Sequence, residues 1–130
     1  MEELNQITSA AVAAAMLHEQ MHDLDHEEVW IIYLNSIFIP IGTEMVSKGT
    51  LTETSIDCRT VLRHALLHNA AALILLHNHP SGNPKPSQQD IHFTDQLRKA
   101  CLLIDIRLVD HIITSKKSFY SFIEEKVFTY

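Results

Sequence analysis

Two short histidine clusters carry residue types and spacings that suit a metal-dependent hydrolase. The first is HEQMH, in which His18 and His22 stand one helical turn apart with Glu19 beside the first of them. Two imidazoles at that spacing can hold a zinc ion while the glutamate activates a water. The second is HNHPSGNPKPSQQD, which begins at His77 and contains His79. Both clusters are therefore candidates for a metal site.

The second cluster specifies more of a metal site than the first. His77 and His79 are two residues apart at the end of a predicted strand, so both side chains leave the same face. The turn residues at 80–82 lead to a helix that Ser87 would begin, with Asp90 in its first turn. Two histidines and an aspartate, with a fourth position for water, form the arrangement of a catalytic zinc site. Ser87 and Asp90 also match a capping box, which would explain both residues without a metal.

HEQMH has weaker support. The pattern defines only three positions, so it often arises by chance. On the predicted helix, His18 and His22 lie about 100° from the apolar stripe, at the helix edge. A third ligand would have to come from a second helix, and the next predicted one offers His64 and His68 without an acid in its interior. These observations favour a solvated helix edge over a zinc site.

The hydrophobic pattern predicts the elements that must position these residues. Apolar periodicity and capping residues predict three helices, over 7–24 with Thr8 or Ser9 as its cap, over 57–69, and over 87–103. Runs of apolar residues predict five strands, at 29–34, 37–46 with a bend at 40–42, 71–77, 104–114 and 119–123. The order α-β-β-α-β-α-β-β indicates an α/β (α+β) fold, with a mixed β-sheet flanked by helices.

Length and composition indicate one globular domain. The chain has 130 residues, of which 46% are hydrophobic, and we expect a single domain over 1–130 with a leading helix in 1–24 and a core in 25–123. The acidic N-terminus does not resemble a signal peptide, and no apolar run could cross a membrane, so we expect a cytoplasmic protein. Cys58 and Cys101 form no C-x-x-C motif and are expected to be reduced thiols.

The charge distribution argues against direct nucleic-acid binding. The net charge is −6, and the first 30 residues contain acids but no Lys or Arg. The rest of the chain is near charge balance and shows no basic stripe that could follow a phosphate backbone. A zinc deaminase would need a P-C-x-x-C motif, which is absent. The pattern leaves the oligomeric state open.

The segment HNHPSGNPKPSQQD resembles the JAMM motif of the JAB/MPN metalloprotease superfamily, in its bacterial RadC-like branch. Further similarity lies in GTL, HNAAALIL, DIRLVDHII and FYSF, so that it extends from about residue 24 to residue 122. The resemblance implies a JAB/MPN-like fold, which is of the cytidine-deaminase-like kind. Members of the branch usually carry a helix-hairpin-helix region in front, and we expect this chain to be a stand-alone catalytic domain without one.

The resemblance also implies a function, that of a zinc hydrolase that cleaves peptide or isopeptide bonds in a protein or peptide substrate. By position in the motif, His77, His79 and Asp90 would bind Zn²⁺, and Ser87 would orient or stabilise the oxyanion. The alternative is a non-catalytic binding or scaffold module associated with DNA-processing or mobile-element proteins.

The family further needs a glutamate that acts as general base, close to where the leading helix gives way to the first strand. Glu27 fits best by its spacing to residues 34–35, Glu28 is second, and Glu44 on the next strand is third. Glu28 and Glu44 are expected to be solvated surface acids. Asp110-His111 also matches the branch pattern, where we expect a hydrogen-bonded pair at a strand end and assign no catalytic role.

Overall fold

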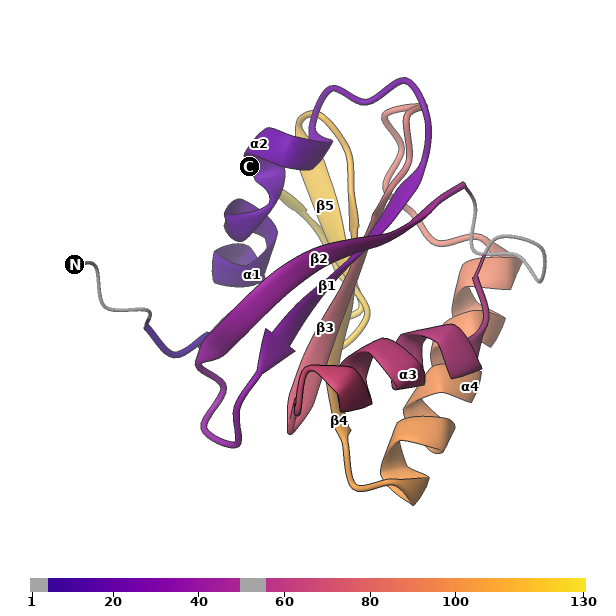
Figure 1. The fold of residues 1–130 in the computed structure, drawn as a ribbon. Helices are drawn as coiled ribbons and strands as arrows, with labels where there is room; N and C mark the ends of the chain where they lie inside the picture. Colours follow the sequence, from indigo (N-terminus) through magenta and orange to yellow (C-terminus); the bar gives the residue numbers. More distant parts are fainter. Residues whose placement is uncertain (1–4, 50–55) are drawn as a thin grey trace.

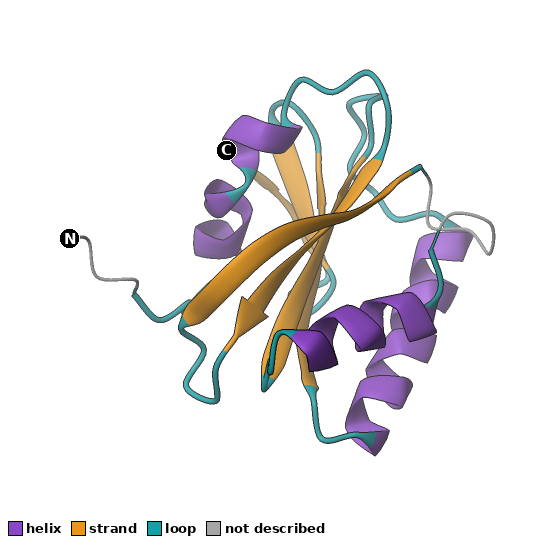
Figure 2. Ribbon diagram, viewed as in Figure 1, coloured by secondary structure: helices purple, strands orange, loops and turns teal. Residues whose placement is uncertain are grey.

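A computed structural model of the protein describes residues 5–49 and 56–130, and these residues form a mixed sheet with helices on both faces (Figures 1 and 2). The helices are α1 (Ala10–Met16), α2 (His18–Met21), α3 (Cys58–Leu67) and α4 (Gln88–Leu103). The strands are β1 (Glu28–Leu34), β2 (Pro40–Lys48), β3 (Ala72–Asn78), β4 (Arg107–Thr114), β5 (Ser118–Ser121) and β6 (Lys126–Thr129).

The sheet order is β2-β1-β3-β4-β5-β6. Strands β3 and β4 are parallel, because α4 carries the chain back across the sheet between them, and every other neighbouring pair is antiparallel. Helices α1 and α2 cover one face and α3 and α4 the other (Figure 1). The predicted fold class, a mixed sheet flanked by helices, is confirmed.

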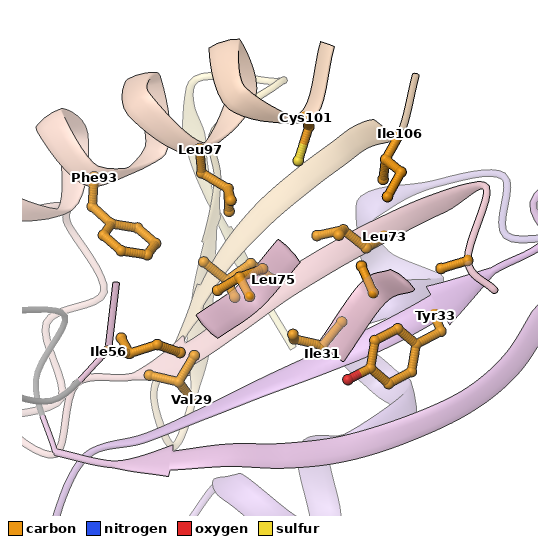
Figure 3. Packing of buried hydrophobic residues seen from close by; sticks show 13 residues of the cluster. Val29, Ile31, Tyr33, Ile56, Leu73, Leu75, Phe93, Leu97, Cys101 and Ile106 are labelled. Atoms are coloured by element: carbon orange, nitrogen blue, oxygen red, sulfur yellow. The ribbon is translucent and has the colours of Figure 1, made fainter. Parts of the chain in front are cut away.

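The central strand β3 is buried along its whole length, which explains its continuous run of apolar residues. Its odd-numbered side chains face α4, and its even-numbered side chains face α1. Figure 3 shows the α4 side, where the buried cluster includes Val29, Ile31, Tyr33, Leu73, Leu75, Phe93, Leu97 and Cys101. By the same alternation, His77 continues the row of Leu73 and Leu75 and points to the α4 side of the sheet.

Side-chain caps begin the helices where the sequence predicts them. The Ser9 hydroxyl accepts a hydrogen bond from the backbone N–H of Val12 at 3.2 Å and caps α1. The Asp57 carboxylate accepts from the N–H of Thr60 at 2.8 Å and caps α3. The cap of α4 is part of the candidate site.

The leading helix is shorter than the predicted range 7–24. It is interrupted at Leu17, whose φ and ψ of −114° and 9° are not helical, and α2 adds a single turn. Leu17 and Met21 are nevertheless buried, so the apolar stripe is the predicted one. The alanine run itself is helical, in agreement with its high helix propensity, and the interruption comes after it.

The strands differ most from prediction at β2, β4 and β6. β2 begins at Pro40, and its predicted bend is a β-bulge at Ile41, since Tyr33 pairs with Gly42 and Leu34 with Pro40. β4 begins only at Arg107, because the chain leaves α4 through a left-handed residue, Asp105, with a φ of 58°. β6 was not predicted, because its four residues are mostly exposed and carry no apolar alternation.

Three other sequence-based expectations concern the cysteines, membrane-spanning helices and the GTL segment. Cys58 and Cys101 are free thiols, as expected. Among the described residues, no helix has the length and apolar character to cross a bilayer. Two residues of the GTL similarity, Thr50 and Leu51, lie outside the described residues.

Candidate metal centre

The candidate site lies where β3 ends and α4 begins, next to the segment that leads into β1. Strand β1 is antiparallel to β3, with Val29 opposite His77. Continuing that register by two residues sets Glu27 opposite His79 and on the same face of the sheet. The loops that precede β1 and follow β3 lie together at one end of the sheet (Figure 1). Segments 50 residues apart in the chain thus meet at the site.

Three potential ligand side chains converge on one point. The Nε2 atoms of His77 and His79 are 3.1 Å apart. The two oxygens of Asp90 each approach one ring, with Oδ1 at 3.2 Å from Nε2 of His77 and Oδ2 at 3.2 Å from Nε2 of His79. Zinc bonds of about 2.0–2.1 Å in a tetrahedron set neighbouring ligand atoms about 3.3 Å apart. The donor types and their spacing therefore fit one zinc-sized ion.

The His79 ring is held in the orientation that a metal ligand requires. Its Nδ1 lies 2.9 Å from the carbonyl oxygen of Asn83, and a carbonyl only accepts, so Nδ1 carries the hydrogen. In the neutral ring the lone pair is then on Nε2, which faces His77 and Asp90. The loop turns tightly enough for this contact because Gly82, with a φ of 92°, takes a left-handed conformation.

Asp90 is at once a capping residue and a candidate ligand. Its Oδ2 accepts a hydrogen bond from the backbone N–H of Ser87 at 2.7 Å, and the Ser87 hydroxyl accepts from the N–H of Asp90 at 3.1 Å. The predicted capping box is present, and it also aims the buried carboxylate at the two histidines. The two interpretations of Ser87 and Asp90 are therefore compatible.

The pKa values of the site reflect the contacts between the Asp90 carboxylate and the rings of His77 and His79. Burial raises the pKa of Asp90, but hydrogen bonds with His77 and His79 outweigh that effect and hold the pKa well below its ordinary value. Burial lowers the pKa of His79, but the contacts with Asp90 and the Asn83 carbonyl outweigh it and raise the pKa above its ordinary value. A metal ion between these side chains would bind Nε2 of His77 and His79 only when those nitrogens carry no proton. Metal binding would therefore compete with protonation of the two rings.

Glu27 supplies a second carboxylate at the rim. One of its oxygens lies within 4.8 Å of a ring nitrogen of His77 and of His79, so the three side chains face one point. A pocket of about 340 Å³ opens at this rim and is lined by Glu27, His79, Pro80, Ser81, Ser87, Gln89 and Asp90. All the polar groups expected to do chemistry, apart from the buried His77, thus face the same open space.

Asn78 holds the Glu27 segment in place. Its side-chain oxygen accepts a hydrogen bond from the N–H of Glu28 at 2.7 Å, and its amide donates to the carbonyl oxygen of His26 at 2.8 Å. The two hydrogen bonds hold the backbone in place on both sides of Glu27. The sequence analysis ended the predicted strand at residue 77, but Asn78 is the buried last residue of β3. An asparagine between two candidate ligand histidines is the signal that could have indicated this role.

The other two glutamates considered as the general base lie in different surroundings. Glu28 is buried and accepts hydrogen bonds from Trp30 Nε1 at 3.0 Å and from His26 Nε2 at 2.7 Å. Glu44 accepts from the Tyr33 hydroxyl at 2.7 Å and lies 2.8 Å from His64 Nδ1. The expectation of a solvated surface acid is wrong for Glu28, which is buried, whereas the Glu44 side chain is about one-third exposed and has specific partners.

HEQMH does not assemble a comparable group among the described residues. The His18 and His22 rings stack on each other with centroids 4.9 Å apart, and His18 also packs on Tyr130 at 4.1 Å. Glu19 is exposed. The stacking explains why the histidines lie one turn apart, and it agrees with the predicted helix edge.

Asp110 and His111 are hydrogen-bonded, as expected, through the backbone N–H of His111, but they lie within β4 and not at its end. The Asp110 carboxylate accepts from the Ser121 hydroxyl at 2.7 Å, from the backbone N–H of Ile123 at 3.1 Å and from the backbone N–H of His111 at 2.8 Å. Burial raises the pKa of Asp110 above its ordinary value, although these hydrogen bonds oppose the rise. The carboxylate thus fastens β4 to the turn after β5.

The His111 ring points instead to the metal centre. Its Nε2 lies 2.7 Å from Nδ1 of His77, and its Nδ1 lies 2.6 Å from the hydroxyl of Thr94. Complete burial, together with the neighbouring His77, lowers the pKa of His111 well below its ordinary value. The sequence analysis did not identify Thr94. Its position one helical turn after Asp90 is the signal that could have indicated it.

Comparison with known proteins agrees with the fold. The family model of the RadC-like JAB domain matches residues 7–127. A UPF0758 protein of Flavobacterium johnsoniae is 37% identical over 125 residues, which are 96% of this chain and 55% of that protein. A UPF0758 protein of Pseudomonas entomophila is 50% identical over 93 residues, which are 72% of this chain and 41% of that protein.

The sheet with its flanking helices and its site of two histidines and two acids define a domain of the JAB/MPN superfamily. The chain belongs to its RadC-like JAB domain family, so the predicted resemblance is confirmed. It spans about half the length of the curated relatives that it matches. The name UPF0758 states no activity, metal or substrate.

Proposed function

We propose that this domain is a zinc-dependent hydrolase of the JAMM type, which cleaves peptide or isopeptide bonds in a protein or peptide substrate. The observation that carries the proposal is the convergence of His77, His79 and Asp90 at 3.1 to 3.2 Å, a spacing that suits tetrahedral zinc. His77, His79 and Asp90 would hold the ion. When bound, zinc lowers the pKa of a coordinated water to about 7 and polarises the substrate carbonyl.

Glu27 is the proposed general base. Its carboxylate lies within 4.8 Å of a ring nitrogen of His77 and of His79, and it lines the open pocket. It takes a proton from the attacking water and then returns it to the leaving amine. Glu28 is bound to Trp30 and His26, and Glu44 to Tyr33 and His64, so neither has a free carboxylate at this rim.

Ser87 is the proposed oxyanion donor. Its oxygen accepts the N–H of Asp90, which leaves the hydroxyl hydrogen free to point into the pocket that it lines. Donation to the oxygen of a tetrahedral intermediate stabilises the transition state more than the ground state. In comparable sites, one such donor contributes about 10²- to 10³-fold to kcat.

The test compares Glu27→Gln with Glu44→Gln. Each protein is analysed for bound zinc and then incubated with a peptide and isopeptide library, with and without a chelator. We expect chelator-sensitive cleavage by the wild type and by Glu44→Gln. Glu27→Gln should retain zinc and lose about 10²- to 10⁴-fold in rate, the usual contribution of a general base.

Two outcomes would contradict the proposal. Full activity in Glu27→Gln would move the general base to another residue. A zinc-loaded wild type that binds peptides but cleaves none of them would favour the alternative, a non-catalytic binding or scaffold module.

A further inference from the structure

A chain of three hydrogen bonds, one buried and two part-buried, connects two of the proposed metal ligands behind the site. It starts at Nδ1 of His77, which lies 2.7 Å from Nε2 of His111. It continues from Nδ1 of His111 to the Thr94 hydroxyl at 2.6 Å, and from that hydroxyl to the backbone carbonyl of Asp90 at 2.7 Å. The rings of His77 and His111 are inaccessible to solvent, so water does not compete for the hydrogen bond between them.

The groups in this chain allow one arrangement of hydrogens when His77 binds a metal. Coordination uses the lone pair of Nε2, so Nδ1 of the neutral ring must carry the hydrogen and donate it to Nε2 of His111. The His111 ring then carries its own hydrogen on Nδ1 and donates it to Thr94. The Thr94 hydroxyl in turn has one hydrogen, which it donates to the Asp90 carbonyl. Every donor has an acceptor because the chain ends on a group that only accepts.

We propose that His111 and Thr94 are positioning residues, which hold His77 in the tautomer and orientation that present its Nε2 to the metal. The inference rests on the metal site of the proposed function, and it does not depend on whether the domain cleaves peptides. It gives a role to the histidine of the Asp110-His111 pair. Hydrogen-bond partners behind a metal-bound histidine commonly set its tautomer and its affinity for the ion.

The fold holds both positioning residues rigidly. His111 lies on β4, which is parallel to β3, and its ring stacks on Phe122 with centroids 4.6 Å apart and planes 2° apart. The Asp110 carboxylate fixes the backbone N–H of His111. Thr94 lies one helical turn after Asp90, so α4 carries a proposed ligand and the end of the hydrogen-bond chain on one face. A rotation of the His111 ring would break its hydrogen bonds to His77 and to Thr94 together.

The first test uses His111→Phe and His111→Gln. The phenylalanine keeps an aromatic ring against Phe122 and removes both nitrogens, while the glutamine keeps an acceptor oxygen for Nδ1–H of His77. Zinc affinity is measured by competition with a chromogenic chelator. We expect His111→Phe to bind zinc about 10- to 100-fold more weakly than the wild type, and His111→Gln to recover most of that loss.

A second pair of variants leaves the ring in place. Thr94→Val removes the acceptor for Nδ1–H of His111 at nearly unchanged volume, whereas Thr94→Ser keeps the hydroxyl. We expect about tenfold weaker zinc binding in Thr94→Val and wild-type affinity in Thr94→Ser. This pair keeps the proposal testable if His111→Phe does not fold, which circular dichroism would reveal.

The spectroscopic readout is the tautomer of His111, from ¹⁵N–¹H correlation spectra of the imidazoles in zinc-loaded wild-type protein. We expect the hydrogen on Nδ1 and an unprotonated Nε2. A hydrogen on Nε2 of His111, or equal zinc affinity in Thr94→Val and Thr94→Ser, would overturn the proposal. If the wild type binds zinc with the expected tautomer but cleaves no peptide, the proposed function fails and this inference stands.

Discussion

Two regions of the molecule combine two histidines with acidic residues, and they differ in where the side chains point. At the metal centre, His77, His79 and Asp90 converge within 3.2 Å, with Glu27 at the rim. On the outer part of the sheet, β2 and α3 bring together the second group, which comprises Glu44, His64 and His68. Composition alone would make the two groups equal candidates for a metal.

The partners of each ring make the difference. His68 directs its Nδ1 to the carbonyl of His64 at 2.8 Å, its Nε2 is 3.9 Å from Glu44, and its ring stacks on Tyr33. Glu44 is already bonded to the Tyr33 hydroxyl. In this group the Glu44 oxygens accept hydrogen bonds, while ring nitrogens of His64 and His68 face oxygens that only accept, so the group does not direct its lone pairs at a common point. At the metal centre, carbonyl and imidazole partners behind the rings leave Nε2 of both histidines directed at one point.

The largest expected effect is on zinc retention. Asp90→Asn removes the charge that holds the ion between His77 and His79, so we expect zinc content after dialysis to fall close to zero. His64→Ala removes a histidine of the second group and should leave zinc content unchanged. Elemental analysis of both purified variants tests the comparison, and equal zinc loss in the two would contradict it.

Ser87→Ala should reduce kcat by about 10²- to 10³-fold with zinc retained, because the oxyanion loses its donor. The substitution also removes a helix cap, which costs about 1 kcal/mol of stability. Ser9→Ala removes the cap of α1 and is the matched control, with a similar stability loss and unchanged kcat. Equal kcat values for the two variants would show that Ser87 acts only as a cap.

Asn78→Ala should lower kcat by about 10- to 100-fold without loss of zinc, because it frees the backbone on both sides of Glu27. The unpaired N–H of Glu28 also costs about 1–3 kcal/mol of stability. Asn35→Ala is the control, since Asn35 accepts from the backbone N–H groups of Ile37 and Ile39 at the far end of β1. A wild-type kcat in Asn78→Ala would exclude a role in placing Glu27.

The smallest effect concerns the second group. The hydrogen bond from Tyr33, with the nearby rings of His64 and His68, lowers the pKa of Glu44 below its ordinary value despite partial burial. A carboxylate whose pKa is lower in the folded state stabilises the fold above its unfolded pKa of about 4.3, and the stabilisation disappears as the pH falls through the folded pKa.

Glu44→Gln should therefore lower the free energy of unfolding near neutral pH by less than about 1 kcal/mol, since the side chain is about one-third exposed. The difference from the wild type should shrink toward about pH 3, and zinc content should not change. Urea titrations at several pH values measure the effect. A difference that grows as the pH falls would contradict the assigned direction of the pKa shift.

Much of the architecture could be predicted from the sequence, because local signals indicate it directly. Asp57 and Ser87 cap helices at the predicted positions, and the run of apolar residues before His77 is the buried central strand. The prediction failed where local signals were weak or misleading. β6 lacks an apolar pattern, and the predicted leading helix is interrupted at Leu17 although its apolar stripe continues through Met21.

The sequence by itself determined which residues could bind a metal, because His77, His79 and Asp90 lie close along the chain, on a strand end and the first turn of the next helix. Only the tertiary structure decided which glutamate faces them and what supports them. Glu27 reaches His79 through the β1–β3 register, and His111 reaches His77 through the parallel β3–β4 pair. Pairings between distant strands depend on the packing of the whole sheet, and residue spacing along one chain carries no direct record of them.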